Sequence, residues 1–257
     1  MNIREIAGSN RNYFEINREE RNYAAILYAA LCIPGNAEKF LESCGLSTKL
    51  DPEFSIYFEY AFLRDLWDSI SNDETKINII RKLLKIRGIR EILELPVRDM
   101  NQRFGASGTG LSDKIQFPGK WAISKYHKNF ESDIDFVRVC KFKWSFNIKP
   151  DIVIHRDKDN AVCIEAKYQS REGSYPSSPK DKHIFTARGL PKIGQTEVQK
   201  YMMEELLGVE TEFIFLVSKK ESSRTHDVVT WWDAFANLDM IEMSVFARKM
   251  AEQISDS

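Results

Sequence analysis

The stretch PDIVIHRDKDNAVCIEAKYQ, residues 150–169, decides the fold. Two apolar runs, Asp151–His155 and Ala161–Lys167, flank a polar segment that is rich in turn-forming residues. Short apolar runs separated by such a segment are typical of paired β-strands. The stretch therefore predicts two apolar β-strands joined by a polar turn.

The second predicted strand carries two charges where a purely structural strand would be apolar. Side chains alternate along a strand, so Cys163, Glu165 and Lys167 share one face, and Val162, Ile164 and Ala166 share the other. Glu165 and Lys167 are therefore expected to point in the same direction.

The length of the turn decides whether Asp151 joins them. If the hairpin closes by pairing His155 with Ala161, or Arg156 with Asn160, Asp151 lies directly opposite Glu165. A loop of four residues would send Asp151 to the other face, unless a bulge corrected the register.

Two carboxylates side by side repel each other, and a bound divalent cation removes that repulsion. Oxygen ligands of this kind suit Mg²⁺ or Mn²⁺. On the same face, Lys167 would orient or deprotonate an attacking water and stabilise charge on a phosphoryl group. The residues thus predict a phosphodiester hydrolase, and the alternative is a set of surface charges on an edge hairpin.

Pro150-Asp151, followed after 13 residues by Glu165-Ala166-Lys167, resembles the PD-(D/E)xK nuclease superfamily. The resemblance covers about Glu131 to Trp231. It implies a restriction-endonuclease-like fold and a magnesium-dependent cut in a nucleic-acid backbone. It also implies metal ligation by Asp151, Glu165 and the main-chain carbonyl of Ala166, with Lys167 as the catalytic lysine.

Two further candidates follow from the same resemblance. Many members add a carboxylate from a preceding helix. The candidate here is Glu20, with Glu19 beside it. The alternative is that Glu20 is a solvated charge in the first helical turn. Some exonuclease-like members carry Gln-x-x-x-Tyr after the lysine strand. Here Gln195 is followed by Gln199 in place of the tyrosine, so Gln195 is either a substrate-binding residue or a polar helix start.

The fold class expected is α/β (α+β), with a mixed sheet flanked by helices. Residues Ile134–Phe146 alternate between apolar and polar side chains and predict a long strand. Further strands are expected at Glu212–Val217 and Asp227–Trp231, with helices at Gln195–Leu207 and from Trp232 to Ile254.

The first half of the chain has helical periodicity. In REERNYAAILYAALC the apolar side chains recur at three- and four-residue steps. Further helices are expected at Asn36–Cys44, Pro52–Ile70 and Asp73–Leu95.

The Gly-rich stretch FGASGTGLSDKIQFPG, which lacks the Lys-Ser/Thr pair of a phosphate-binding loop, marks a boundary. The expected organisation is a mainly helical N-terminal region (1–104), a linker (105–130) and the nuclease core (131–257).

The segment Tyr168–Gly194 is long for a simple connection and follows the catalytic strand directly. Its basic side chains suit a mobile flap that binds phosphates, and the alternative is disorder without a role. The substrate-binding candidates in it are Arg171, Lys180, Lys182 and Arg188. A second basic cluster, in IRKLLKIRGIR (80–90), would bind a nucleic-acid backbone or be solvated helix surface.

Composition sets outer limits on the function. The 257 residues carry 37 Lys and Arg against 38 Asp and Glu, so no overall positive field attracts nucleic acid and local patches must do so. The four cysteines lack zinc-site spacing, and no apolar run has the length of a signal peptide or a membrane span. A cytoplasmic location without a membrane partner is expected.

These patterns together predict a nuclease dependent on Mg²⁺ or Mn²⁺, above all a DNA endonuclease of the restriction or defence type. Homodimers are expected where two strands need two cuts. The alternatives are a structure-selective or RNA-directed nuclease, and a non-catalytic nucleic-acid- or protein-binding module with the same fold.

Overall fold

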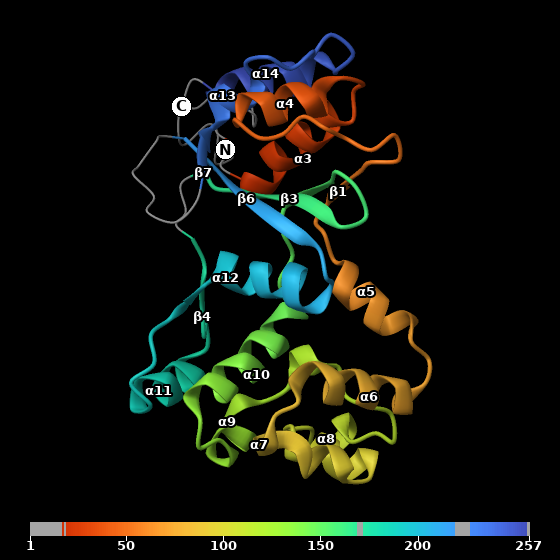
Figure 1. Ribbon diagram of the computed structural model, residues 1–257. Helices are drawn as coiled ribbons and strands as arrows, with labels where there is room; N and C mark the ends of the chain where they lie inside the picture. The colour runs from red at the N-terminus through yellow and green to blue at the C-terminus, as the bar shows by residue number, and fades with distance from the viewer. Residues whose placement is uncertain (1–16, 18, 169–171, 219–226, 256–257) are drawn as a thin grey trace, which may run out of the picture. The chain divides into compact units, whose positions relative to one another are not determined.

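The computed structural model describes residues 17, 19–168, 172–218 and 227–255 (Figure 1). The chain forms two compact units. Unit 1 comprises Met1–Tyr60, Pro150–Arg171 and Thr211–Ser257, and unit 2 comprises Ala61–Lys149 and Glu172–Glu210. Unit 2 is therefore built from two insertions into the chain of unit 1.

The boundaries of these units differ from those expected from composition, which divided the chain into residues 1–104, 105–130 and 131–257. Residues 105–130 lie wholly within unit 2. Phe104 is buried and stacks on Trp121, with ring centroids 3.9 Å apart. The Gly-rich stretch therefore packs inside unit 2 and does not separate two domains.

A five-stranded sheet forms the centre of unit 1, in the order β1-β2-β3-β6-β7. The strands are Ser55–Phe58 (β1), Ile152–His155 (β2), Asn160–Ala166 (β3), Glu210–Val217 (β6) and Asp227–Thr230 (β7). The pairs β1–β2 and β2–β3 are antiparallel, whereas β6 and β7 are parallel. The prediction of a mixed sheet with flanking helices is confirmed at this level.

Helices of unit 1 pack together against this sheet (Figure 1). They are Glu20–Leu31 (α3), Asn36–Ser43 (α4), Trp231–Phe235 (α13) and Val245–Ser255 (α14). The predicted stripe of α3 is buried at Tyr23, Leu27 and Leu31, in one core with Ile154 and Ile164. Each such side chain contributes roughly 1.5–3 kcal/mol when it is buried.

The helix predicted for Pro52–Ile70 is wrong. The chain there forms β1, followed by the short helix α5 (Phe62–Ser69) in unit 2. Pairing across the sheet decides the outcome, because Ile56 lies opposite Ile154 of β2. The single helix expected after Trp232 is also wrong, since α13 ends at Phe235 and α14 begins at Val245.

Unit 2 is mainly helical. Besides α5, its α-helices are Asp73–Leu84 (α6), Arg87–Arg90 (α7), Val97–Arg103 (α8), Ile123–Tyr126 (α9), Asp133–Ser145 (α10), Pro179–Ala187 (α11) and Gln195–Lys200 (α12). Shorter helical turns are Ile92–Glu94 (η1), Gly108–Gly110 (η2), Pro118–Lys120 (η3) and His127–Asn129 (η4), and α12 continues as the π-helix Tyr201–Leu206 (η5). Two short strands, Ser174–Tyr175 (β4) and Ile193–Gly194 (β5), pair antiparallel.

The long strand predicted for Ile134–Phe146 is wrong, because this segment is helix α10. Aromatic side chains surround the helix. Phe136 and Trp144 contact Phe185 on one side, whereas Phe142 contacts Trp121. Residues two apart point in nearly opposite directions on a helix. An alternating apolar pattern therefore also suits a helix that is buried on two sides.

A capping signal before this segment favours the helix. The side chain of Ser132 accepts a hydrogen bond from the N–H of Asp135 at 3.3 Å, and Asp133 and Asp135 lie in the first turn. Serine caps and early acidic residues are typical of helix N-termini. Ser-x-x-Asp in the sequence was the local signal that the strand prediction overlooked.

The segment between Tyr168 and Gly194 is largely structured and not one long mobile flap. It contains β4, α11 and β5, and Ser178 caps α11 by accepting a hydrogen bond from the N–H of Asp181 at 3.1 Å. Residues 169–171, including the candidate Arg171, lie outside the described residues. Nowhere in the described ranges is a helix long and apolar enough to cross a membrane.

Candidate functional site

The β2–β3 hairpin has the register that brings the candidate carboxylates together. Ile152 pairs with Ile164, and His155 pairs with Ala161. The N–H of Arg156 donates to the carbonyl of Asn160 at 2.9 Å, which closes a three-residue loop. The predicted register is thereby confirmed, and its continuation by one residue sets Asp151 opposite Glu165.

The loop is fixed by its own side chains. Asp157 Oδ1 accepts hydrogen bonds from the N–H groups of Asp159 and Asn160, each at 2.8 Å. An aspartate that bonds to the backbone two or three residues ahead favours a tight turn over a longer loop. The sequence RDKDN thus sets the turn, and the turn sets the position of Asp151.

Asp151 directly precedes β2 and is held there by two hydrogen bonds. Its Oδ2 accepts a hydrogen bond from the N–H of Ala166 at 2.8 Å, and its main-chain carbonyl accepts one from Glu59 at 2.8 Å. Burial, and next the charge of Glu165, raise the pKa of Asp151 to about 7, although the Ala166 N–H and Lys167 oppose the rise. Near neutral pH this carboxyl therefore holds its proton in part.

Glu165 and Lys167 form a buried ion pair. Lys167 Nζ lies 2.6 Å from Glu165 Oε1, with only 4% of the glutamate side chain and 13% of the lysine side chain exposed. Burial alone lowers the pKa of Lys167, but the charge and hydrogen bond of Glu165, together with Asp151 and Glu20, outweigh burial and raise the pKa. Lys167 is therefore a firmly protonated ammonium group.

The main chain around Lys167 is fixed on both sides. Its N–H donates to the carbonyl of Leu216 in β6 at 2.8 Å. Its carbonyl accepts a hydrogen bond from Trp231 Nε1 at 3.1 Å, and the Trp231 side chain is fully buried. The lysine side chain thus extends from a rigid backbone, which favours a defined position for its charge.

Glu20 reaches the same region from α3. Its Oε2 accepts a hydrogen bond from the N–H of Tyr168 at 2.7 Å, directly after Lys167. Its charge also contributes to the raised pKa of Lys167. The structure therefore brings Glu20 close to the end of β3, whereas Glu19 occupies the N-cap position of α3.

Glu59 belongs to the site and was missed in the sequence, where it fell inside an expected helix. It follows β1 with a φ of 53°, in the left-handed region that is unusual for a residue other than glycine. Its charge raises the pKa of Asp151, and its Oε1 lies 2.9 Å from Nε of Arg21. The alternation in FSIYF before it was the signal for a strand ending here.

Replacing Glu59 with Gln should move the pKa of Asp151 downward, because one neighbouring negative charge disappears. Carbon-13 NMR titration of the Asp151 carboxyl measures this directly. Glu59→Gly serves as the backbone control. Since a left-handed conformation costs a non-glycine residue about 1–2 kcal/mol, this variant should be more stable to urea than Glu59→Gln. An unchanged or higher pKa of Asp151 in Glu59→Gln would contradict the assignment of Glu59 to the site.

The remaining candidates belong to unit 2. Lys180 and Lys182 are exposed on α11. The N–H of Gln195, at the start of α12, donates to the carbonyl of Gly173 at 2.8 Å. Arg188 donates hydrogen bonds to the carbonyl of His127 at 2.7 Å and to that of Phe130 at 2.8 Å. It also forms an ion pair with Asp133, and its guanidinium group lies over the ring of Phe136. These contacts give Arg188 a structural role inside unit 2.

The residues present fit a divalent cation. Two carboxylates would supply oxygen ligands. Burial, and next the charge of Glu165, raise the pKa of Asp151, so a bound cation would favour its ionised form. In the part of the chain that the structure describes, no group of three or more His, Cys, Asp and Glu side chains is arranged to hold a metal ion. The Ala166 carbonyl and water would therefore have to complete the coordination.

Comparisons with protein-family models, with curated proteins and with solved structures found no match for this chain.

Proposed function

We propose that unit 1 is a metal-dependent nuclease that hydrolyses phosphodiester bonds, with DNA as its substrate and Mg²⁺ or Mn²⁺ as its cofactor. One observation carries the proposal. Asp151 lies opposite Glu165 across the β2–β3 register, and the ammonium of Lys167 lies 2.6 Å from Glu165. Carboxylates, a cation and a fixed ammonium group are components that metal-dependent phosphodiester hydrolysis can use.

Each residue has a defined task in this proposal. Asp151, Glu165 and the main-chain carbonyl of Ala166 would hold the metal ion, which when bound polarises the phosphoryl oxygens and lowers the pKa of a ligand water. Lys167, whose pKa is raised, stabilises negative charge that develops on the phosphoryl group. Its protonated state favours this role over that of a general base. Glu20 and Trp231 both bind the peptide group between Lys167 and Tyr168, and so fix the backbone directly after the lysine.

The order of elements in the chain supports the resemblance to the PD-(D/E)xK superfamily. A helix (α3) precedes three strands (β1, β2 and β3), and a helix (α12) and another strand (β6) follow them. The first of the three strands is β1 and not Ile134–Phe146, and α12 belongs to unit 2. We therefore propose a restriction-endonuclease-like core, interrupted between β1 and β2 by most of unit 2.

A second candidate, a non-catalytic binding module, is favoured by one observation. The Glu165–Lys167 pair satisfies both of its charges internally. A buried pair of this kind also occurs as a purely structural element. The assay must therefore distinguish hydrolysis from binding.

The decisive assay offers the full chain supercoiled plasmid, linear duplex DNA, single-stranded DNA and RNA, each with Mg²⁺, Mn²⁺ or EDTA. We expect cleavage of DNA that depends on the metal and is abolished by EDTA. Preferential cleavage of RNA or of branched DNA would identify an RNA-directed or structure-selective nuclease. Binding without cleavage under every metal would overturn the proposal and support the binding module.

A further inference from the structure

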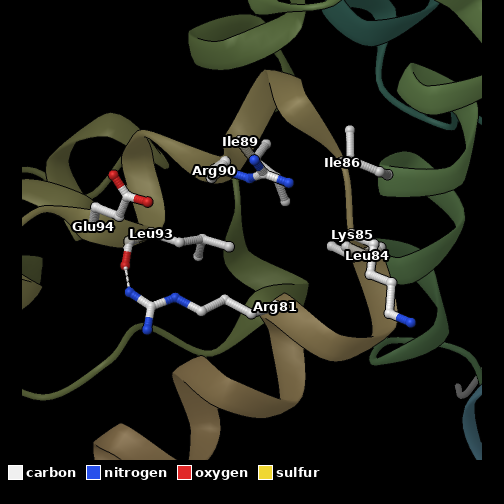
Figure 2. A pocket seen from close by; sticks show the side chains of 8 residues that line it. All are labelled: Arg81, Leu84, Lys85, Ile86, Ile89, Arg90, Leu93 and Glu94. Carbon is white, nitrogen blue, oxygen red and sulfur yellow. Dashed lines mark hydrogen bonds between the residues drawn. The ribbon is translucent and has the colours of Figure 1, made fainter.

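Unit 2 contains a pocket of about 610 Å³. Its lining comes from one short part of the chain, which runs from the end of α6 through α7 to η1. The lining residues are Arg81, Leu84, Lys85, Ile86, Ile89, Arg90, Leu93 and Glu94 (Figure 2). A volume of this size suits a small organic ligand, for which pockets measure about 300–1,000 Å³.

The pocket combines an apolar floor with a cationic rim. Leu84, Ile86, Ile89 and Leu93 are almost fully buried, at 0–5% exposure. Three cationic side chains, Arg81, Lys85 and Arg90, line the same pocket and are exposed, against one carboxylate. Such a lining suits a ligand with an apolar body and more than one negative charge.

The rim has a fixed component. Arg81 Nη2 donates a hydrogen bond to the carbonyl of Leu93 at 2.6 Å, so one of the five guanidinium donors holds the side chain across the pocket. Figure 2 shows Arg81 and Arg90 on opposite sides of the space, with Glu94 at one end and Lys85 at the other. Lys85 has a φ of 20°, an unusual value for a non-glycine residue.

We propose that this pocket binds a nucleoside phosphate. The flat base would lie against the small exposed part of the apolar floor and the alkyl stems of the cationic side chains, and the guanidinium groups of Arg81 and Arg90 would bind the phosphates. The Glu94 carboxylate would accept hydrogen bonds from an exocyclic amino group or a ribose hydroxyl. The nucleotide is either free in solution or the 5′-terminal nucleotide of a polynucleotide.

Simpler ligands leave part of the pocket unused. Inorganic phosphate needs no apolar floor, and an apolar ligand without charge would gain nothing from the three cations of the rim. The Glu94 carboxylate, placed among cations, indicates a ligand that also donates hydrogen bonds. The proposal does not depend on the carboxylate site of unit 1.

Helix α7 offers a matched pair of variants. Arg90 lines the pocket, whereas Arg87, three residues earlier and also exposed, does not. Arg90→Glu and Arg87→Glu change the net charge equally. The probe is a fluorescent N-methylanthraniloyl derivative of ATP, bound to the full chain in EDTA so that no nucleic acid is cleaved.

We expect saturable binding that Arg90→Glu weakens at least about tenfold, because a charged hydrogen bond to phosphate is replaced by repulsion. Arg87→Glu should weaken it less than about twofold, since exposed charges at a distance are screened by salt. Tripolyphosphate should compete at least about tenfold more weakly than ATP, because it lacks a base to bury.

Competition by a 5′-phosphorylated single-stranded oligonucleotide identifies the source of the nucleotide. Stronger competition than by ATP assigns the pocket to a polynucleotide end, and weaker or no competition assigns it to free nucleotides. Equal weakening by the two arginine variants, equal competition by tripolyphosphate, or absence of saturable binding would each overturn the proposal.

Discussion

Cleavage of DNA by the full chain should fall at least about 10³-fold in Asp151→Ala, because this variant loses a ligand of the metal ion. A bound metal ion contributes several kcal/mol of transition-state stabilisation, and each 1.36 kcal/mol changes the rate about tenfold. Lys167→Ala should lower kcat by about 10²–10³, the usual cost of removing one group that stabilises developing charge. Initial rates on supercoiled plasmid at saturating Mg²⁺ measure both effects.

The hairpin supplies matched controls for these variants. Asp159→Ala and Lys158→Ala remove the same charges from the exposed loop, where 68% and 89% of the side chains are accessible. Both controls should retain the wild-type rate. Equal activity of Asp151→Ala and wild-type protein would show that the pair does not carry the reaction.

A folding control is needed for Lys167→Ala, because this change leaves Glu165 buried without its cation. Breaking a buried pair in this way costs about 3–5 kcal/mol. The double variant Glu165→Gln with Lys167→Met removes both charges and should recover much of that stability without recovering activity. Recovery of activity in the double variant would contradict a catalytic role for the lysine.

In the absence of metal, Asp151→Asn should stabilise unit 1 at alkaline pH. The pKa of Asp151 is about 7 in the folded protein against 3.8 for an ordinary aspartate. A raised carboxyl pKa contributes stability that is fully present below about pH 4 and is lost as the pH rises through 7. The wild-type protein should therefore weaken over this interval, whereas the variant, which cannot ionise there, should not.

The expected gain for Asp151→Asn at pH 8 in EDTA is about 1–3 kcal/mol, and it should vanish near pH 4. Hydrogen exchange of the β2 and β3 amides reports the stability of unit 1 directly. Asp159→Asn is the control and should change nothing.

Saturating Mg²⁺ at pH 8 should protect the wild-type amides and not those of Asp151→Asn, because only the wild type holds the cation. A gain in stability that does not depend on pH would argue against a strained carboxylate pair.

The sequence by itself determined the hairpin and the three side chains that it presents. Asp157 and Asn160 close a short turn with local hydrogen bonds, and the two-residue alternation then assigns Asp151, Glu165 and Lys167 to one face. Local bonds and local periodicity are visible in the chain because they need no distant partner. The buried stripe of α3 was predictable for the same reason.

Only the tertiary structure decided what those elements contact. The alternating pattern of Phe136, Phe142 and Trp144 is compatible with a strand, and it became a helix because aromatic side chains of unit 2 cover it on two sides. Glu20 contacts Tyr168 across 148 residues of chain, and Glu59 reaches Asp151 from β1. A local pattern shows which side chains are buried, but their partners depend on the packing of distant segments.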